Sequence, residues 1–380
     1  MIISLLAAAL LVAQGSSPPV IDPTIADVPS LDQTSEAVPG SSQRNGHKGV
    51  TPLIAPIPFH NSQIGWGGVL MLGLIHRFDP DTTLKPSTGA LGVMASENGS
   101  WGVMGIEVAR FKQDTWRVRG MANYLNVNYD FYGIGIDAGE SGRSVPLDQT
   151  FFMTAGVLLR RVAGKFYAGA SVIFLETTID LPDSLAPGLP PVPDQAKAQL
   201  IAPGLQGEYD TRDNDYWPSH GSLAELKARF FSTATGESGS FQRYQVAWSW
   251  YNGLRGRDLV FATNINACAA PGDAPFYGLC MLGSGRYNMR GYTQGRYRDH
   301  VGSVVQAELR AHKGRGGAVV FGGLGQVAPS LGDIFDTKLL PAGGLGLRYQ
   351  LTQKYPMHMR LDYAWGLDGG LLYFSVGEAF

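Results

Sequence analysis

The sequence predicts an all-β protein, a transmembrane antiparallel β-barrel of about 16 strands, and three observations lead to this fold class. Only 16% of the 380 residues are charged, against roughly 25% in an ordinary soluble domain, and 50 residues are glycine. Beyond the N-terminus no 18 apolar residues run together, which excludes membrane-spanning helices. From Ile64 onward, segments of ten to fifteen residues alternate in polarity between turn signals, as membrane-spanning strands do.

The chain is expected to begin with a secretory signal peptide, residues 1–15. Ile2 to Val12 form an apolar run that is too short to span a bilayer, and Ala13-Gln14-Gly15 has the small residues of a cleavage site. A buried N-terminal strand is the alternative interpretation. Export would place the rest of the chain in an oxidising compartment.

Residues 16–58 are expected to form a periplasmic linker. They are rich in Pro, Ser and Asp and show no apolar period, so they bury little surface. This composition does not suit a folded module ahead of the barrel. The barrel domain is therefore expected to span residues 59–380.

Polarity alternates most clearly in four segments, residues 223–230, 244–250, 305–312 and 358–365. In the third of them Val305 and Leu309 share one face, and Glu308 and Arg310 share the other. A soluble β-sandwich alternates in the same way, but it places its charges in water around a continuous core. The low charge, the export signal and the strand length favour a barrel with its charges in the lumen.

Counting strands backwards from Phe380 gives alternating short turns and longer loops, and about fifteen clear strands. Both ends of a barrel chain lie on one side of the membrane only when the strand number is even. A first strand is therefore expected within Val50–Phe59. Pro52, Pro56 and Pro58 remove ladder donors there, which predicts a weak closing seam.

The sequence ends in a predicted strand, Leu371–Phe380. Leu372, Phe374, Val376 and Phe380 share one face of this strand, and the last residue is aromatic. Such an ending is typical of outer-membrane barrels.

Two cysteines are present, Cys268 and Cys280, twelve positions apart. In an exported protein such a pair favours a disulfide bond within one loop, worth about 3 kcal/mol in the chain-entropy model. Two unpaired thiols are the alternative. No histidine lies between or beside them, so no metal site is expected.

The most unusual stretch is Arg286–His300, which carries four arginines and three tyrosines between two strand-like segments. Loops are usually built from Ser, Asn, Gly and Pro, so a plain solvent loop is not expected here. The centre of the stretch, Met289-Arg290-Gly291-Tyr292, resembles the (Val/Ile)-Arg-Gly-(Phe/Tyr) motif of the BamA/TamA-type outer-membrane barrel superfamily, also called the bacterial surface antigen family.

Further motifs carry the same resemblance, which covers residues 59–380 and is most specific after Tyr209. Tyr209–Asp213 followed by Pro218–Gly221 resembles the mid-barrel strand and turn of the family. Gly343–Arg348 and Arg360–Tyr363 resemble its last three strands.

The resemblance implies that the long surface loop folds back into the lumen, where Arg290 would pair with acidic residues of the wall. In the family one such acid lies in a Phe-x-Asp-x-Gly motif, but here Gly323 occupies its place. Glu308 matches a second acidic position, and Glu308 and Asp362 are the candidate wall partners of Arg290. Contact of Arg290 with water and loop carbonyls alone is the alternative.

The resemblance also implies a function and a location. The chain would be a barrel-only member of the family, without POTRA modules, in the outer membrane of a Gram-negative bacterium. It would insert or translocate protein or lipid, in contact with outer-membrane lipid and with a protein cargo or a separate periplasmic partner. A passive pore or a structural barrel without translocase activity is the competing hypothesis.

We expect no enzyme, no catalytic residue, no cofactor and no metal. The net charge of −2 gives no reason to expect nucleic acid as a partner. The sequence has no Gly-x-Ser-x-Gly elbow and no Walker loop. A lumenal hydrolase site at His312 or His358 is the remaining enzymatic alternative.

Overall fold

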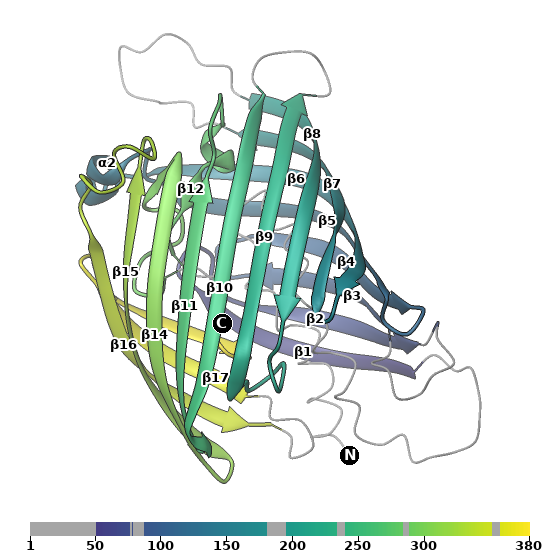
Figure 1. The fold of residues 1–380 in the computed structure, drawn as a ribbon. Coiled ribbons are helices and arrows are strands. Elements are labelled where there is room, and N and C mark those ends of the chain that lie inside the picture. Colours follow the sequence, from purple (N-terminus) through teal and green to yellow (C-terminus); the bar gives the residue numbers. More distant parts are fainter. Residues whose placement is uncertain are drawn as a thin grey trace, which may run out of the picture.

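The computed structural model describes residues 51–76, 78, 87–180, 195–233, 240–283, 289–351 and 358–380. The predicted signal peptide and residues 16–50 of the predicted linker lie outside the described residues. Sixteen strands form a closed antiparallel barrel, which confirms the predicted fold class (Figure 1). None of the described helices has the length and apolar character needed to cross a membrane.

The barrel strands follow one another around the wall in chain order. They are β1 (Thr51–Asn61), β2 (Gly65–His76), β3 (Ser87–Ser96), β4 (Trp101–Phe111), β5 (Trp116–Phe131), β6 (Val145–Ala163), β7 (Phe166–Asp180), β8 (Gln195–Asp210), β9 (His220–Thr233), β10 (Phe241–Arg257), β11 (Leu259–Ala269), β14 (Val301–Lys313), β15 (Gly316–Ala328), β16 (Leu340–Gln350), β17 (His358–Gly366) and β18 (Gly369–Val376).

The two ends of the barrel differ. At one end, which we call the loop end, lie the connections 132–144, 270–300 and 329–339. They carry the short helices α2 (Ile136–Ser141) and η3 (Phe276–Gly278) and the strand pair β12 (Cys280–Met281) and β13 (Arg298–Asp299). The opposite turn end has shorter connections such as 112–115 and 314–315, and there β1 begins and β18 ends.

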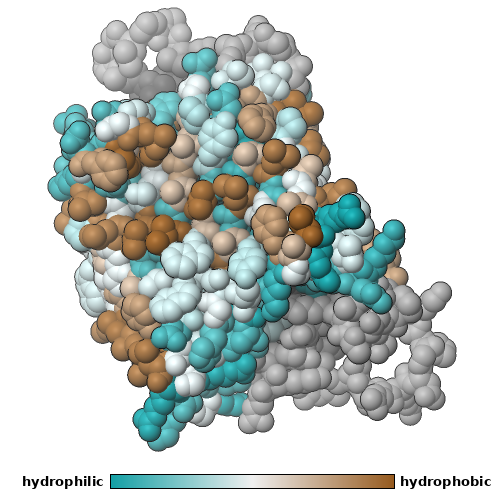
Figure 2. Space-filling view, in the orientation of Figure 1, coloured by the Kyte–Doolittle hydropathy of each residue, from teal (hydrophilic) through white to brown (hydrophobic). Residues whose placement is uncertain are grey.

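The predicted alternation in polarity is confirmed. In β14, Val305 and Leu309 are half exposed on the outside, whereas Glu308 and Arg310 are fully buried inside. In β10 the outward residues include Trp248 and Trp250. Figure 2 shows apolar side chains gathered across the middle of one face, with hydrophilic residues toward its ends. This arrangement suits a wall in contact with lipid hydrocarbon.

The inside of the barrel is divided into two sectors, which the sequence did not predict. The wall of β9–β18 carries most of the buried charges, including Lys227, Arg229 and Asp362. The inward side chains of β2–β7 are instead largely apolar and pack into one cluster, which includes Val69, Met71, Met94, Leu125, Val127, Met153, Ile173 and Leu175. Polarity alternates only weakly in this half because both faces of its strands are apolar.

The barrel begins at Thr51, so the predicted boundary between linker and barrel at residue 59 is wrong. All eleven residues of β1 pair with β2. Pro52, Pro56 and Pro58 occupy alternate positions, and alternate residues of a strand direct their backbone groups to the same edge. Because the ladder to β2 is unbroken, the three missing donors fall on the edge that faces β18.

The closing seam between β1 and β18 is accordingly short. It contains a single described residue pair, His60↔Phe374, and a 2.8 Å hydrogen bond between His60 Nδ1 and the Leu372 carbonyl oxygen. Every other pair of neighbouring barrel strands shares at least eight residue pairs.

The predicted final strand, Leu371–Phe380, extends past the observed end of the last strand. β18 stops at Val376, and Gly377 adopts a positive φ of 93°. Phe380 therefore does not continue the outward face; its side chain is 4% exposed and packs inside the barrel. A glycine tolerates this left-handed turn because it has no Cβ.

Candidate functional site in the barrel lumen

The candidate site is built from inward positions of β14–β17 and from the tip of the loop that connects β11 to β14. Glu308 and Asp362 lie at alternate, inward positions of β14 and β17. Their side chains are 1% and 0% exposed. The motif Met289–Tyr292 is buried against the same wall, whereas Arg286 lies outside the described residues.

Arg290 joins the loop to both expected wall partners. Its Nη1 donates to Asp362 Oδ2 at 2.5 Å, and its Nη2 donates to Glu308 Oε1. The guanidinium also lies 3.5 Å from the centroid of the Phe321 ring, a cation–π contact. One arginine thus binds two carboxylates from strands that are separated along the wall by β15 and β16.

These ion pairs belong to a larger set that we call the lumenal charge network, consisting of Arg290, Glu308, Arg310, Arg348, Arg360, Asp362 and Glu378. Arg310 Nε donates to Glu308 Oε2 at 2.8 Å, and Arg348 Nη1 donates to Asp362 Oδ1 at 2.5 Å. Each carboxylate that binds Arg290 therefore has a second arginine of its own. Buried charges persist when they are paired in this way.

The network continues toward the turn end through Arg348, whose Nε donates to Glu378 Oε2 at 2.8 Å. Burial by itself raises the pKa of the Glu378 carboxyl group, but Arg348, Arg310 and His358 outweigh it. The pKa of Glu378 therefore lies below its ordinary value, and the carboxylate stays charged.

An aspartate at Gly323, where the family motif would place one, would require the wall around it to shift. A Cβ at this position would lie 2.7 Å from the Val305 carbonyl oxygen and 3.0 Å from Gln306 Cγ. Asp362, two strands farther along the wall, supplies a carboxylate to Arg290 instead.

The backbone of the loop tip is also held by the wall. The Gly291 N–H donates to the Tyr373 hydroxyl at 3.0 Å, and the Tyr292 hydroxyl donates to the Pro341 carbonyl oxygen at 2.7 Å. No pattern in the sequence marks Phe321 or Tyr373 as a contact of the motif. Only their inward positions on β15 and β18 could have indicated it.

Connections at the loop end cover the motif. The Gly135 N–H donates to the Arg298 carbonyl oxygen at 2.8 Å, and Arg296 Nε donates to the Gly139 carbonyl oxygen at 3.0 Å. Tyr297, which is fully buried, donates to Asp368 at 2.9 Å. Burial and this contact raise the pKa of the Tyr297 hydroxyl, so it remains a donor. The segment around α2 therefore closes over the loop.

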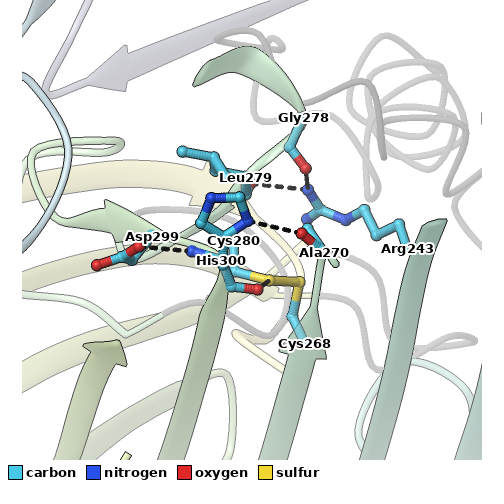
Figure 3. Close-up of a disulfide and its surroundings, with 8 residues drawn as sticks. All are labelled: Arg243, Cys268, Ala270, Gly278, Leu279, Cys280, Asp299 and His300. Carbon is cyan, nitrogen blue, oxygen red and sulfur yellow. Dashed lines mark hydrogen bonds between the residues drawn. A yellow bond between two sulfur atoms is a disulfide. The ribbon is translucent and has the colours of Figure 1, made fainter. Parts of the chain in front are cut away.

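The base of the loop is fixed by a disulfide bond between Cys268 of β11 and Cys280 of β12 (Figure 3). Arg243 Nη1 donates to the carbonyl oxygens of Gly278 and Leu279 at 2.8 and 2.7 Å. The His300 ring makes a 2.8 Å hydrogen bond with the Ala270 carbonyl oxygen. The loop is thus held to the wall at its base and, independently, at Arg290.

Removal of the disulfide should destabilise the protein without releasing the loop tip. We expect Cys268→Ser with Cys280→Ser to lower the free energy of unfolding by about 3 kcal/mol, because the crosslink restricts the unfolded chain. Urea unfolding in detergent, followed by the loss of heat-modifiable migration, measures this change. The reduced parent protein is the matched control and should behave like the double variant. An unchanged midpoint in both would show that the bond adds no stability.

No metal site is evident in the described part of the chain. No group of three or more His, Cys, Asp or Glu residues there could hold a metal ion. His312 and His358 lie together, with ring centroids 4.9 Å apart, and both pack on Trp217. Neither ring forms a hydrogen bond with a serine among the described residues. The site is thus suited to holding a loop by charge.

Comparison with known proteins agrees with this architecture. A family model described as Omp85 superfamily domain matches residues 110–326. No curated protein matches the chain. BamA from Haemophilus ducreyi lacking POTRA domains 1–3 is similar in structure, with a TM-score of 0.60 and 15% identity over 88% of this chain and 71% of that chain.

Two CdiB structures are also similar. CdiB from Acinetobacter baumannii has a TM-score of 0.57 and 15% identity, with 88% of this chain and 60% of that chain covered. CdiB from Escherichia coli has a TM-score of 0.56 and 14% identity, with 89% and 66% covered. At these identities the likeness concerns the fold, and the chain spans less than two thirds of either CdiB protein.

Proposed function

Because this chain belongs to the Omp85 superfamily, we propose that it inserts or translocates polypeptide or lipid at the outer membrane. It is a multi-pass β-barrel of the Gram-negative outer membrane. The proposed activity is non-enzymatic: it needs a lumen that opens, a wall that can part and a cargo that enters. A protein cargo, or a separate periplasmic partner that delivers it, would complete the system.

The single observation that carries the proposal is the seam between β1 and β18. One residue pair joins these strands, and the prolines of β1 remove donors on the same edge. Unpaired edges are templates for another strand, so a short seam can accept or release an extended polypeptide sideways into the lipid. The ion-paired loop supports the proposal, since it would keep the lumen closed until cargo arrives.

The seam should crosslink unevenly. We expect cysteines at His60 and Phe374 to form a disulfide readily, whereas cysteines at Pro58 and Val376 should react slowly because no ladder holds them together. Control pairs at Val305 with Leu324 and at Leu309 with Val320, all facing outward between β14 and β15, should react equally. Oxidation in detergent, read by gel mobility, measures the yields. Equal yields in all pairs would contradict a weak seam.

A locked seam tests the function itself. Vesicles containing the His60→Cys, Phe374→Cys variant should speed the folding of a urea-unfolded eight-stranded barrel when the bond is reduced, and less when it is oxidised. NBD-labelled phosphatidylethanolamine in the same vesicles reports lipid movement by dithionite quenching. The Val305→Cys, Leu324→Cys variant receives the same oxidation and reduction and should show no difference. Equal activity of the oxidised and reduced forms of the His60→Cys, Phe374→Cys variant, or no activity in either form, would favour a passive pore or a structural barrel.

A further inference from the structure

The chain segment after β18 lies inside the barrel. Gly377 donates its N–H to the His358 carbonyl oxygen at 2.8 Å and turns the following residues inward. Ala379 and Phe380 are 8% and 4% exposed, and they pack with inward residues of β10 and β11. Figure 1 places the C-terminal end within the outline of the barrel. We call residues 377–380 the tail.

Side chains of the wall contact the aromatic end of the tail, and we call this set of wall residues the pocket. The Phe380 ring belongs to a cluster with Ala247, Tyr251 and Ala262. The Arg310 guanidinium lies 5.1 Å from the centroid of that ring and donates from Nη2 to the Phe380 carbonyl oxygen at 3.1 Å. Cation–π and hydrogen-bond contacts from one arginine thus recognise both the ring and the backbone of the same residue.

The acidic residue of the tail is recognised separately. Arg348 donates to Glu378 Oε2 at 2.8 Å, and His358 Nδ1 lies 3.5 Å from Glu378 Oε1. Trp217, from the turn between β8 and β9, packs on the His358 ring and lies within 5.9 Å of the Arg310 guanidinium. The pocket therefore accepts a carboxylate two positions before an aromatic ring.

The groups that bind the tail are positioned by the wall and not by the tail. Arg310 is held by Glu308, and Arg348 is held by Asp362. Both arginines would keep their places if the tail left. They also offer more donors than the tail uses: Arg310 Nη1 and Arg348 Nη2 have no hydrogen-bond partner among the described residues. A ligand richer in acceptors could satisfy them.

We propose that the turn end of the lumen is a peptide-binding site for a segment of another polypeptide that carries a carboxylate two residues before an aromatic side chain. The tail of this chain occupies the site in cis and competes with that segment. The site adjoins the loop motif, because Arg310 and Arg348 bind the carboxylates of Glu308 and Asp362 that also bind Arg290. The proposal does not depend on movement of cargo through the barrel. The chemistry of the pocket identifies the bound segment, which should have an acidic residue, then a small residue, then an aromatic residue in succession.

Peptide binding to the whole chain in detergent tests the proposal. The probe is a fluorescent peptide with the sequence of residues 375–380, and fluorescence anisotropy reads its binding. The variant Glu378→Gln with Phe380→Ala weakens the tail in the pocket while it leaves β18 intact. We expect this variant to bind the peptide at least about tenfold more tightly than the parent protein. A scrambled peptide of the same composition controls for net charge.

Two further changes locate the binding. Peptides with the Phe380→Ala or Glu378→Gln replacement should bind about tenfold more weakly to the tail variant. Tyr251→Ala added to that variant should remove binding, whereas Arg315→Ala, at an exposed position of the same end, should not. Equal binding of the scrambled peptide, or no binding by the folded tail variant, would overturn the proposal.

If the tail variant does not fold, photolabelling of the parent protein tests the same proposal. A peptide with a photoreactive phenylalanine at its last position, at saturating concentration, should label residues of the Trp217 turn or of β10. Labelling confined to other surfaces, or no labelling, would overturn the site.

Discussion

Replacing Arg290 by alanine should open the lumen to ions. The side chain forms the ion pairs that join the loop tip to the wall, and it binds two buried carboxylates. Without it the loop tip keeps only its hydrogen bonds and apolar contacts. In planar bilayers the Arg290→Ala variant should show larger and noisier channels than the parent protein, because the loop leaves its place for part of the time.

Glu308→Ala should open the lumen as well, but with a larger loss of stability. In Arg290→Ala, Glu308 keeps Arg310 and Asp362 keeps Arg348, so no buried carboxylate is left alone. In Glu308→Ala, Arg310 loses the carboxylate that accepts from its Nε while its side chain is 0% exposed. Loss of one partner of a buried pair costs roughly 3–5 kcal/mol. The double variant should conduct little more than either single variant, because both changes remove one shared contact.

Arg296→Ala is the matched control for this pair. Arg296 lies in the same loop, but its ion pair with Asp368, at 2.9 Å, is partly exposed at the loop end. We expect the conductance of the Arg296→Ala variant to stay near that of the parent protein. If the effects of Arg290→Ala and Glu308→Ala simply add, or if neither variant changes conductance, the loop is not held by this pair.

Gly291→Ala should release the loop without removing any charge. Gly291 has a φ of +104°, and a Cβ there would lie 3.0 Å from both Ala342 Cβ and the Trp365 carbonyl oxygen. The alanine would combine backbone strain with contacts closer than a packed wall allows. We expect the loop tip to shift and the conductance to rise as it does in Arg290→Ala.

Gly369→Ala separates the two causes. Gly369 has a similar φ of +119°, but no atom lies within 4 Å of its hypothetical Cβ. Both variants carry the backbone strain, of about 1–3 kcal/mol, and only Gly291→Ala meets the wall. Bilayer conductance should therefore rise for Gly291→Ala alone. Equal conductance of the two variants would mean that the close approach at Gly291 does not hold the loop.

The sequence by itself determined that the chain forms a barrel, the number of its strands, and that the loop carrying Met289–Tyr292 is not a plain solvent loop. These features depend on local patterns: side chains alternate with a period of two along a strand, and proline removes a donor wherever it stands. The cysteine pair and the Met289–Tyr292 motif are likewise readable from the chain. The prediction was weakest in β2–β7, where both faces are apolar and alternation carries little signal.

The tertiary structure alone decided which groups meet. Asp362 lies 72 positions from Arg290, and only closure of the wall brings it to the loop beside Glu308. The same closure brings the Val305 carbonyl oxygen within 2.7 Å of the place where a Cβ at Gly323 would lie, and it turns Phe380 inward to Arg310. Such contacts depend on the register between strands far apart in the chain and on the space between their side chains. Neither quantity is a property of a local pattern, because both arise when the barrel closes.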